Sequence, residues 1–382
     1  MYIEPFGVEL WMNEWETKCA LNLAETCVSS LTIAELLQLT GQNESDLSAL
    51  LPMKMTYGAI EGSERLRAAV ATLFDVHAPE DIVVTHGTIG ANMLVHKALV
   101  ERNDHVVVIV PTYQQHYSIP ASIGADVEPL HLREENGFLP DPDALRAIVT
   151  PETKLIAMNN PNNPTGALMP RALIEEIAAI ARGVGAYILC DEVYRGTDQT
   201  GDGMTASIVD VYEKGISTAG MSKAFSLAGL RLGWIAAPQE VIAKVMIHRD
   251  YDTISVGVID DHFATIALEN KDRILARSRA ITRGNLKVLA DWVDAEPRIS
   301  WVKPHAATVC LLKYDLNMSS RAFCVALLEE TGVMLTPGSA LGMEGYLRIG
   351  FANDPEILRE GLSRLSGFLA AQNARQHLAN AP

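Results

Sequence analysis

The chain has 382 residues, of which 48% are hydrophobic and 20% are charged, a composition typical of a globular protein with one large and one smaller domain. Its 47 acidic residues outnumber its 31 lysines and arginines, and the net charge of −16 argues against nucleic acid or an anionic membrane surface as a partner. The five cysteines are scattered and form no C-x-x-C pair, so neither a metal site nor a redox dithiol is expected.

The N-terminal sequence MYIEPFGVELWMNEWE carries early acidic residues and no basic segment followed by an apolar run, so no signal peptide is expected. No stretch of the chain reaches the roughly 18 apolar residues that a membrane helix requires. We therefore expect a cytoplasmic protein.

Short apolar runs alternate with longer helical patterns through the first two thirds of the chain. The runs are DIVVT (81–85), HVVVIV (105–110), KLIAMN (154–159), AYILC (186–190) and LGWIAA (232–237). They predict parallel strands that are covered on both faces, and apolar spacing predicts helices over 88–102, 142–150 and 170–185. This alternation predicts a doubly wound α/β domain, in which the ligand lies at the carboxyl ends of the strands.

The pattern changes from about residue 284, where a smaller α+β unit is expected. Its predicted strands lie in RISWVK (298–303), ATVCLLK (307–313) and YLRIGFA (346–352), and its predicted helices in 319–332 and 354–372. A helical stretch over 260–284 is expected to join the two units. The predicted division is an N-terminal arm (1–45), a large domain (46–283) and a small domain (284–382).

Two cations lie in the stretch TAGMSKAFSLAGLRLGW (218–234), among small and apolar residues. Because a buried ammonium is costly, we expect a lowered pKa for Lys223 and a neutral amine that is nucleophilic toward carbonyls. Arg231 indicates an anion-binding site nearby. Together, Lys223 and Arg231 indicate a cofactor with an aldehyde at one end and a phosphate at the other. The alternative is a surface lysine on a turn.

Other polar residues follow predicted strands and fit the same cofactor. Thr88 and Ile89 begin a helix directly after a strand, where free amides can bind a phosphate, although such turns are common. Asp191 ends the strand AYILCD and can hold a pyridine nitrogen protonated, or it can be an N-cap. Tyr194 and Asn163 can donate to a phenolic oxygen on the ring.

An aromatic residue and a turn complete this predicted edge of the sheet. Tyr113 follows the strand HVVVIV and can stack on a ring, although a tyrosine after a strand is more often part of the core. The turn NNPNNPTG (159–166) is the most specific string in the chain, because two Asn-Pro steps and Thr-Gly fix its backbone geometry.

In order and spacing, N-P-x-N-P-T-G, D-E-V-Y, S-K and G-x-R resemble the motifs of the class I/II aminotransferases, which are pyridoxal 5′-phosphate (PLP) enzymes of fold type I. The resemblance extends from about Tyr57 to Arg348 and implies a mostly parallel sheet in a large domain plus a smaller α+β domain. It also implies a small-molecule amino acid substrate and a homodimer with shared active sites. The N-terminal arm is then expected to fold over the active site and to pack with the small domain.

The resemblance also implies a role for each matching residue. Lys223 would hold PLP as a Schiff base and move the proton at the substrate Cα, with Asp191 and Tyr194 as its catalytic partners. The other expected contacts are Asn163 and Tyr194 to the ring hydroxyl, Tyr113 stacked on the ring, Thr88, Ile89, Ser222 and Arg231 to the phosphate, Tyr57 to the phosphate of the neighbouring subunit, and Arg348 with Asn163 to the substrate carboxylate.

The sequence departs from the family pattern in two places. Gly220 stands where the family usually has a serine or threonine on the phosphate, so the phosphate cup is expected to lack one hydroxyl. NLAETCVSS (22–30) replaces a segment with a glycine beside the substrate. The acidic residues Glu14, Glu16 and Glu25 in this arm can receive a cationic side chain, or they can form the solvated face of an amphipathic helix.

Stretches around the cofactor motifs are similar to capreomycidine synthase, which cyclises a hydroxylated arginine, and EWE…LNLAE is similar to PLP-dependent arginine oxidases. We therefore expect an aminotransferase-family enzyme that acts on a basic, arginine-type amino acid. The alternatives are elimination and cyclisation of a hydroxylated arginine, or arginine oxidation. A non-catalytic PLP-binding regulator is disfavoured, because only about 45 residues precede the first strand–helix units.

Overall fold

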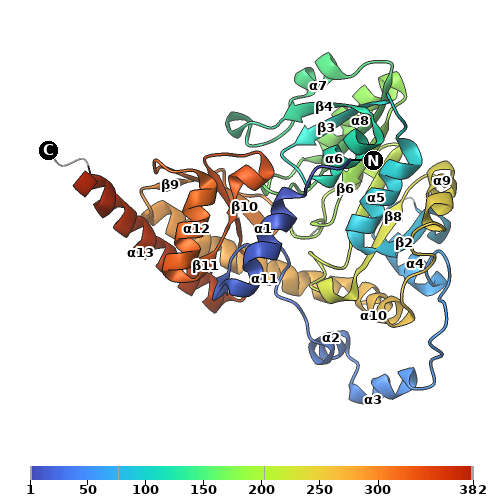
Figure 1. Cartoon of the computed structure of the whole chain (residues 1–382). Helices are drawn as coiled ribbons and strands as arrows, with labels where there is room; N and C mark the ends of the chain where they lie inside the picture. The colour runs from blue at the N-terminus through green and yellow to red at the C-terminus, as the bar shows by residue number, and fades with distance from the viewer. Residues whose placement is uncertain (1, 76, 202, 380–382) are drawn as a thin grey trace.

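The structure is a computed structural model, and it describes residues 2–75, 77–201 and 203–379. Its centre is a seven-stranded sheet (Figure 1), in which β8 runs antiparallel to both of its neighbours and the other pairings are parallel. The strands lie in the order β2 (Ile82–His86), β8 (Leu232–Ala236), β7 (Gly215–Gly220), β6 (Tyr187–Asp191), β5 (Thr153–Asn159), β3 (His105–Val110) and β4 (Asp126–His131). The predicted α/β class with a mostly parallel sheet is confirmed.

All five predicted strands of the large unit are present, within one or two residues at each end. Two further strands, β4 and β7, have no apolar run in the sequence. β4 reads DVEPLH, lies at the edge of the sheet and is largely not buried. β7 reads GISTAG and is buried throughout, but its small and polar residues do not form a hydrophobic pattern.

Alternate residues of the strands face two separate layers of helices. Val106 and Val108 pack with apolar residues of α5 (Gly87–Leu99) and α9 (Gln239–Arg249), whereas Val107 and Ile109 pack with the core that includes α8 (Arg171–Val184). This alternation is expected of strands that are covered on both faces. The other helices of this part are α4 (Glu64–Ala71), α6 (Gln115–Ile123), α7 (Pro142–Ile148) and α10 (Val258–Glu269).

The C-terminal part forms a second, smaller sheet with its own core. The strand order is β12 (Thr336–Pro337), β13 (Tyr346–Gly350), β10 (Val309–Tyr314) and β9 (Ile299–Ser300), and all pairings are antiparallel. α11 (Lys271–Ala295) leads into this part, and α12 (Ser320–Thr331) and α13 (Pro355–Ala379) cover it. The strands and helices predicted here are present, while the domain boundaries at residues 45 and 283 stay predictions.

The N-terminal segment packs on the C-terminal part of the chain. α1 (Gly7–Trp15) lies between the two parts in Figure 1, and β1 (Leu21–Asn22) pairs in parallel with β11 (Val333–Met334). Trp11 is fully buried in the second core, and its Nε1 donates to the carbonyl of Leu335 at 2.9 Å. After β1 the chain continues through α2 (Ile33–Thr40) and α3 (Glu44–Leu47) to the large sheet.

Within the described ranges, no helix has the length and apolar character needed to cross a membrane.

We predict that Trp11→Ala lowers the free energy of unfolding by about 3–5 kcal/mol, the usual cost of removing a fully buried large aromatic side chain. Urea denaturation followed by circular dichroism measures this. Leu10→Ala is the matched control, because Leu10 lies on the same helix with 56% of its surface exposed. Equal losses for the two variants would show that α1 is not anchored through Trp11.

Candidate active site

A cavity of about 470 Å³ opens where the parallel strands end. This volume is within the range of small-molecule sites. Of the predicted site residues, those that line it are Glu16, Glu25, Thr88, Ile89, Tyr113, Asn163, Asp191, Tyr194, Ser222, Lys223, Arg231 and Arg348. The structure therefore brings together residues from the N-terminal arm, the large sheet and the C-terminal part.

Lys223 lies three residues beyond the end of β7. Its Nζ donates to Oγ1 of Thr26 at 2.5 Å and contacts Sγ of Cys27 at 3.4 Å. Burial lowers the pKa of Lys223, but the nearby Cys27, Tyr194 and Glu25 outweigh it, and the net direction is upward. The predicted lowering is therefore wrong for this site, because tertiary packing brings Glu25 and Cys27 of the arm, and Tyr194 after β6, to an amine whose neighbours in sequence are apolar.

Asp191 ends β6, and its carboxylate is contacted by groups from α5, from α6 and from the turn that follows β6. Nδ2 of Asn92 donates to its Oδ2 at 2.9 Å, and the amide of Val193 donates to its Oδ1 at 3.1 Å. Nε2 of His116 lies 3.7 Å from the same Oδ2, and Thr218 donates to Oδ1 of Asn92 at 2.6 Å. These contacts fix an anion at the cavity wall, where it can hold a protonated ring nitrogen.

The sequence analysis did not identify Asn92 or His116, although their spacing offers a signal. Asn92 lies four residues after Thr88, so the two share one face of α5. His116 lies three residues after Tyr113, on α6. The available evidence was a polar residue three or four positions beyond a predicted contact, on the same helix for Asn92 and at the start of the following helix for His116.

The start of α5 has the groups that a phosphate requires. His86, at the N-cap, makes no side-chain capping hydrogen bond, and Oγ1 of Thr88 is buried without a hydrogen-bond partner among the described residues. The Arg231 guanidinium lies beside this helix end, since a Cβ on Gly87 would meet its Nη2 at 3.1 Å. Unpaired donors and a cation at a helix N-terminus form an anion site, so these residues fit the phosphate of PLP.

The glycine at position 220 is required by packing. A Cβ on Gly220 would lie 2.7 Å from Oγ1 of Thr88 and 2.9 Å from the carbonyl oxygen of Leu232. Its partner across the β7–β8 ladder is Gly233, where a Cβ would lie 2.5 Å from the amide nitrogen of Thr88. The helix end therefore sits directly on the sheet, and no side chain fits between them.

Arg348 projects from β13 into the cavity with only 2% of its surface exposed. Its Nη1 donates to Oδ1 of Asn163 at 3.2 Å, and its Nη2 donates to Oγ1 of Thr336 at 3.1 Å and to the carbonyl of Ala24 at 3.3 Å. Nε has no partner among the described residues, and burial lowers the pKa of the guanidinium. A carboxylate is the ligand that such a buried guanidinium binds best.

Three carboxylates of the N-terminal arm line the cavity in addition to Asp191, and the one at Glu9 is one that the sequence analysis missed. Glu9 accepts a hydrogen bond from the Tyr113 hydroxyl at 2.9 Å. Burial and the charges of Glu25 and Glu9 raise the pKa of Glu16. Burial also acts to raise the pKa of Glu25, but Lys223 and hydrogen bonds from the Thr26–Cys27 segment lower it overall.

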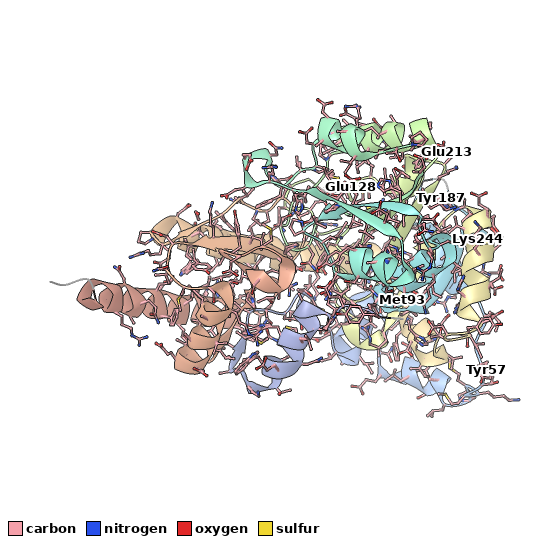
Figure 2. The ribbon with its side chains drawn as sticks, turned by 45° about the horizontal axis from the view of Figure 1, so that its top comes forward. Tyr57, Met93, Glu128, Tyr187, Glu213 and Lys244 are labelled. Atoms are coloured by element: carbon pink, nitrogen blue, oxygen red, sulfur yellow. The ribbon has the colours of Figure 1, made fainter. Side chains whose placement is uncertain are left out.

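Two predicted residues lie away from this cavity. Glu14 forms an ion pair with Arg321 at 2.9 Å on the surface and does not line the cavity, so of its two expected places it takes the solvated one. Tyr57 is 75% exposed and lies at the periphery of the molecule (Figure 2). It does not line the cavity of its own chain, and its expected contact with a neighbouring subunit stays a prediction.

The chain belongs to the aminotransferase class I and II family, whose profile matches residues 38–365. The fold and the cofactor follow from this membership, and the protein is a PLP-dependent transferase.

Individual relatives cover nearly the whole chain. A PLP-dependent aminotransferase from Streptococcus suis has 43% identity and a TM-score of 0.94, over 97% of this chain and 99% of that one. Capreomycidine synthase from Streptomyces vinaceus is 30% identical over 94% of this chain and 92% of its own length. The arginine–pyruvate transaminase of Pseudomonas aeruginosa is 26% identical over 85% of this chain and 84% of its own.

We predict that Gly220→Ser, which introduces the residue usual in the family, lowers the free energy of unfolding by about 1–3 kcal/mol, because overpacking displaces the start of α5. PLP binding should weaken in parallel, as measured by titration of visible absorbance. Gly183→Ala in α8 is the control, since a Cβ there meets nothing within 4 Å. Tighter PLP binding by the serine variant would contradict this account of the cup.

Proposed function

We propose that this protein is an aminotransferase that uses PLP to act at the Cα of a basic, arginine-type L-amino acid. The observation that carries the proposal is the distribution of charge in one cavity. Arg348 lies on one element, and the carboxylates of Glu9, Glu16 and Glu25 lie on the N-terminal arm. A substrate with a carboxylate at one end and a guanidinium at the other complements both groups.

The proposed cofactor contacts are those that the family resemblance implies, and the presence of all these residues in one cavity supports them. Thr88, Ile89, Ser222 and Arg231 would hold the phosphate, Asp191 the ring nitrogen, Asn163 and Tyr194 the ring oxygen, and Tyr113 the ring face. PLP, when bound, supplies an electron sink for charge that develops at the substrate Cα. Lys223 would bind the cofactor covalently and carry the proton at Cα, while Arg348 and Asn163 would orient the substrate carboxylate.

The acidic arm supports the choice of a cationic side chain. Burial and the repulsion between like charges raise the pKa of Glu16, so a bound cation would relieve an unfavourable arrangement. Asn22 donates to Oε1 of Glu16 at 3.5 Å, and one oxygen of Glu25 accepts from the amides of Thr26 and Cys27. Both residues line the cavity.

The second candidate is elimination and cyclisation of a hydroxylated arginine. The similarity to capreomycidine synthase over nearly the full length of both chains favours it. Lys223 and Asp191 would serve the same purposes in that reaction, and the same cavity would hold the substrate. Arginine oxidation stays a further alternative of the same kind, and the cytoplasmic location stays a prediction.

A homodimer is part of the proposal. Large apolar side chains are exposed around Tyr57, namely Leu51, Met55 and Ile60, and exposed Tyr251 follows α9. Arg249 at the end of α9 donates to the carbonyl of Ile60, which joins the two segments. A second copy of the chain would cover this surface and place Tyr57 near the other cavity.

We predict that Glu16→Gln raises KM for L-arginine by about tenfold or more, the worth of a charge-assisted hydrogen bond, and leaves KM for a neutral amino acid unchanged. Glu25→Gln should act in the same direction. Because the pKa of Glu16 is raised, KM for arginine in the wild type should increase as the pH falls through that pKa and the carboxylate loses its charge. Glu14→Gln is the matched control outside the cavity.

Equal changes in KM for basic and neutral substrates on Glu16→Gln would mean that this arm does not recognise the charge of the substrate side chain.

We predict that purified enzyme with L-arginine and pyruvate forms alanine, and forms none without the 2-oxo acid. Amino acid analysis of the mixture measures this, and Lys223→Ala should form no alanine in either case. Consumption of arginine or hydroxyarginine without a 2-oxo acid would instead support the oxidation or cyclisation alternative.

A further inference from the structure

The segment Glu25–Thr26–Cys27 lies directly against the amine of Lys223, and the proposed function assigns no task to Thr26. Nζ of Lys223 donates to Oγ1 of Thr26, and Sγ of Cys27 is the second contact at 3.4 Å. Both contacts come from the N-terminal arm, far from Lys223 in sequence. The sequence analysis identified this segment as a departure from the family pattern and assigned a possible task to Glu25 but none to Thr26 or Cys27.

The position of Thr26 is fixed from several directions. Its amide donates to Oε1 of Glu25 at 2.7 Å, and its carbonyl accepts from Oγ1 of Thr308 at 2.5 Å. The carbonyl oxygen of Glu25 lies against β13: a Cβ built on Gly350 would be only 1.7 Å from this oxygen. The amide of Gly350 also donates to the carbonyl of Leu23 at 2.7 Å. The hydroxyl is therefore presented to Lys223 by a segment that is held in place on both sides.

The groups around the amine differ in what they can contribute. Glu25 and Glu16 come from the arm, Cys27 lies beside Thr26, and Tyr194 follows β6. Burial raises the pKa of Cys27 to about 11 and also raises the pKa of Tyr194, so thiol and phenol are neutral near pH 7. Nζ reaches two acceptors directly, the Thr26 oxygen at 2.5 Å and the Cys27 sulfur at 3.4 Å, and the oxygen is the nearer one.

We propose that Thr26 is a positioning residue for Lys223: its hydroxyl accepts a hydrogen bond from Nζ and sets the place and the protonation of the amine. The inference rests on the proposed role of Lys223. A hydrogen bond to the charged form of an amine favours that form, so the arm controls how much neutral amine is present to capture the cofactor. The packing of the arm on the C-terminal part thereby influences the protonation of Lys223, which follows β7 of the large sheet.

The test uses the full-length protein from which PLP has been removed, and measures the rate of recombination with PLP by visible absorbance as a function of pH. Thr26→Val should shift this profile to lower pH by about one unit, which is about tenfold more neutral amine at a given pH. Thr26→Ser keeps the hydroxyl and should follow the wild-type profile. Ser30→Ala, an exposed position in the same segment, should also follow it.

A valine profile that coincides with the wild type, or a serine profile that shifts as far as valine, overturns the inference. Circular dichroism verifies folding, and Thr26→Ala replaces the valine variant if that protein does not fold. Borohydride fixation followed by peptide mapping separates the two claims. Failure to trap PLP on Lys223 in the wild type would reject the role of the lysine, whereas trapping with identical pH profiles would reject only the role of Thr26.

Discussion

The site depends on one buried cation at the junction of three chain segments. Arg348 donates to Asn163 at the edge of the large sheet, to Thr336 in the small sheet and to the carbonyl of Ala24 in the arm. A buried guanidinium that loses its partners is costly, so these contacts favour one arrangement of the three segments. The three segments meet around the cavity because each of them supplies a hydrogen-bond acceptor to the Arg348 guanidinium.

A second constraint acts at the opposite end of the cavity, where α5 meets the sheet without an intervening side chain. Gly220 and Gly233 lie opposite one another on β7 and β8. Because neither residue has a side chain, the first turn of α5 can pack directly against the two strands. The Thr88 hydroxyl, which has no hydrogen-bond partner in the described part of the chain, and the Arg231 guanidinium both lie there. One end of the cavity is thus rigid through close packing, and the other through hydrogen bonds to a single side chain.

Local patterns were enough to predict the large sheet and the family, because apolar runs and turn motifs act over a few residues. They failed for β7, whose burial comes from its central place in the sheet and not from hydrophobic residues. They also gave the wrong direction for the pKa of Lys223, since Glu25 and Cys27 reach it only through tertiary packing. Tertiary packing also separates the positions of Glu9 and Glu14, which are both acidic residues of α1. Glu9 faces the cavity and accepts from Tyr113, whereas Glu14 forms an ion pair with Arg321.

The parallel pairing of β1 with β11 has a consequence for biosynthesis. Leu21–Asn22 are synthesised long before their partner residues, Val333–Met334. Glu25 and Thr26 cannot take their places until β13 has formed, because their carbonyls contact Gly350 and Thr308. The large sheet can form during translation, but the reactive lysine acquires its contacts with Thr26 and Cys27 only after β13 has been synthesised. A nascent chain therefore carries an unfinished site until β13 has folded.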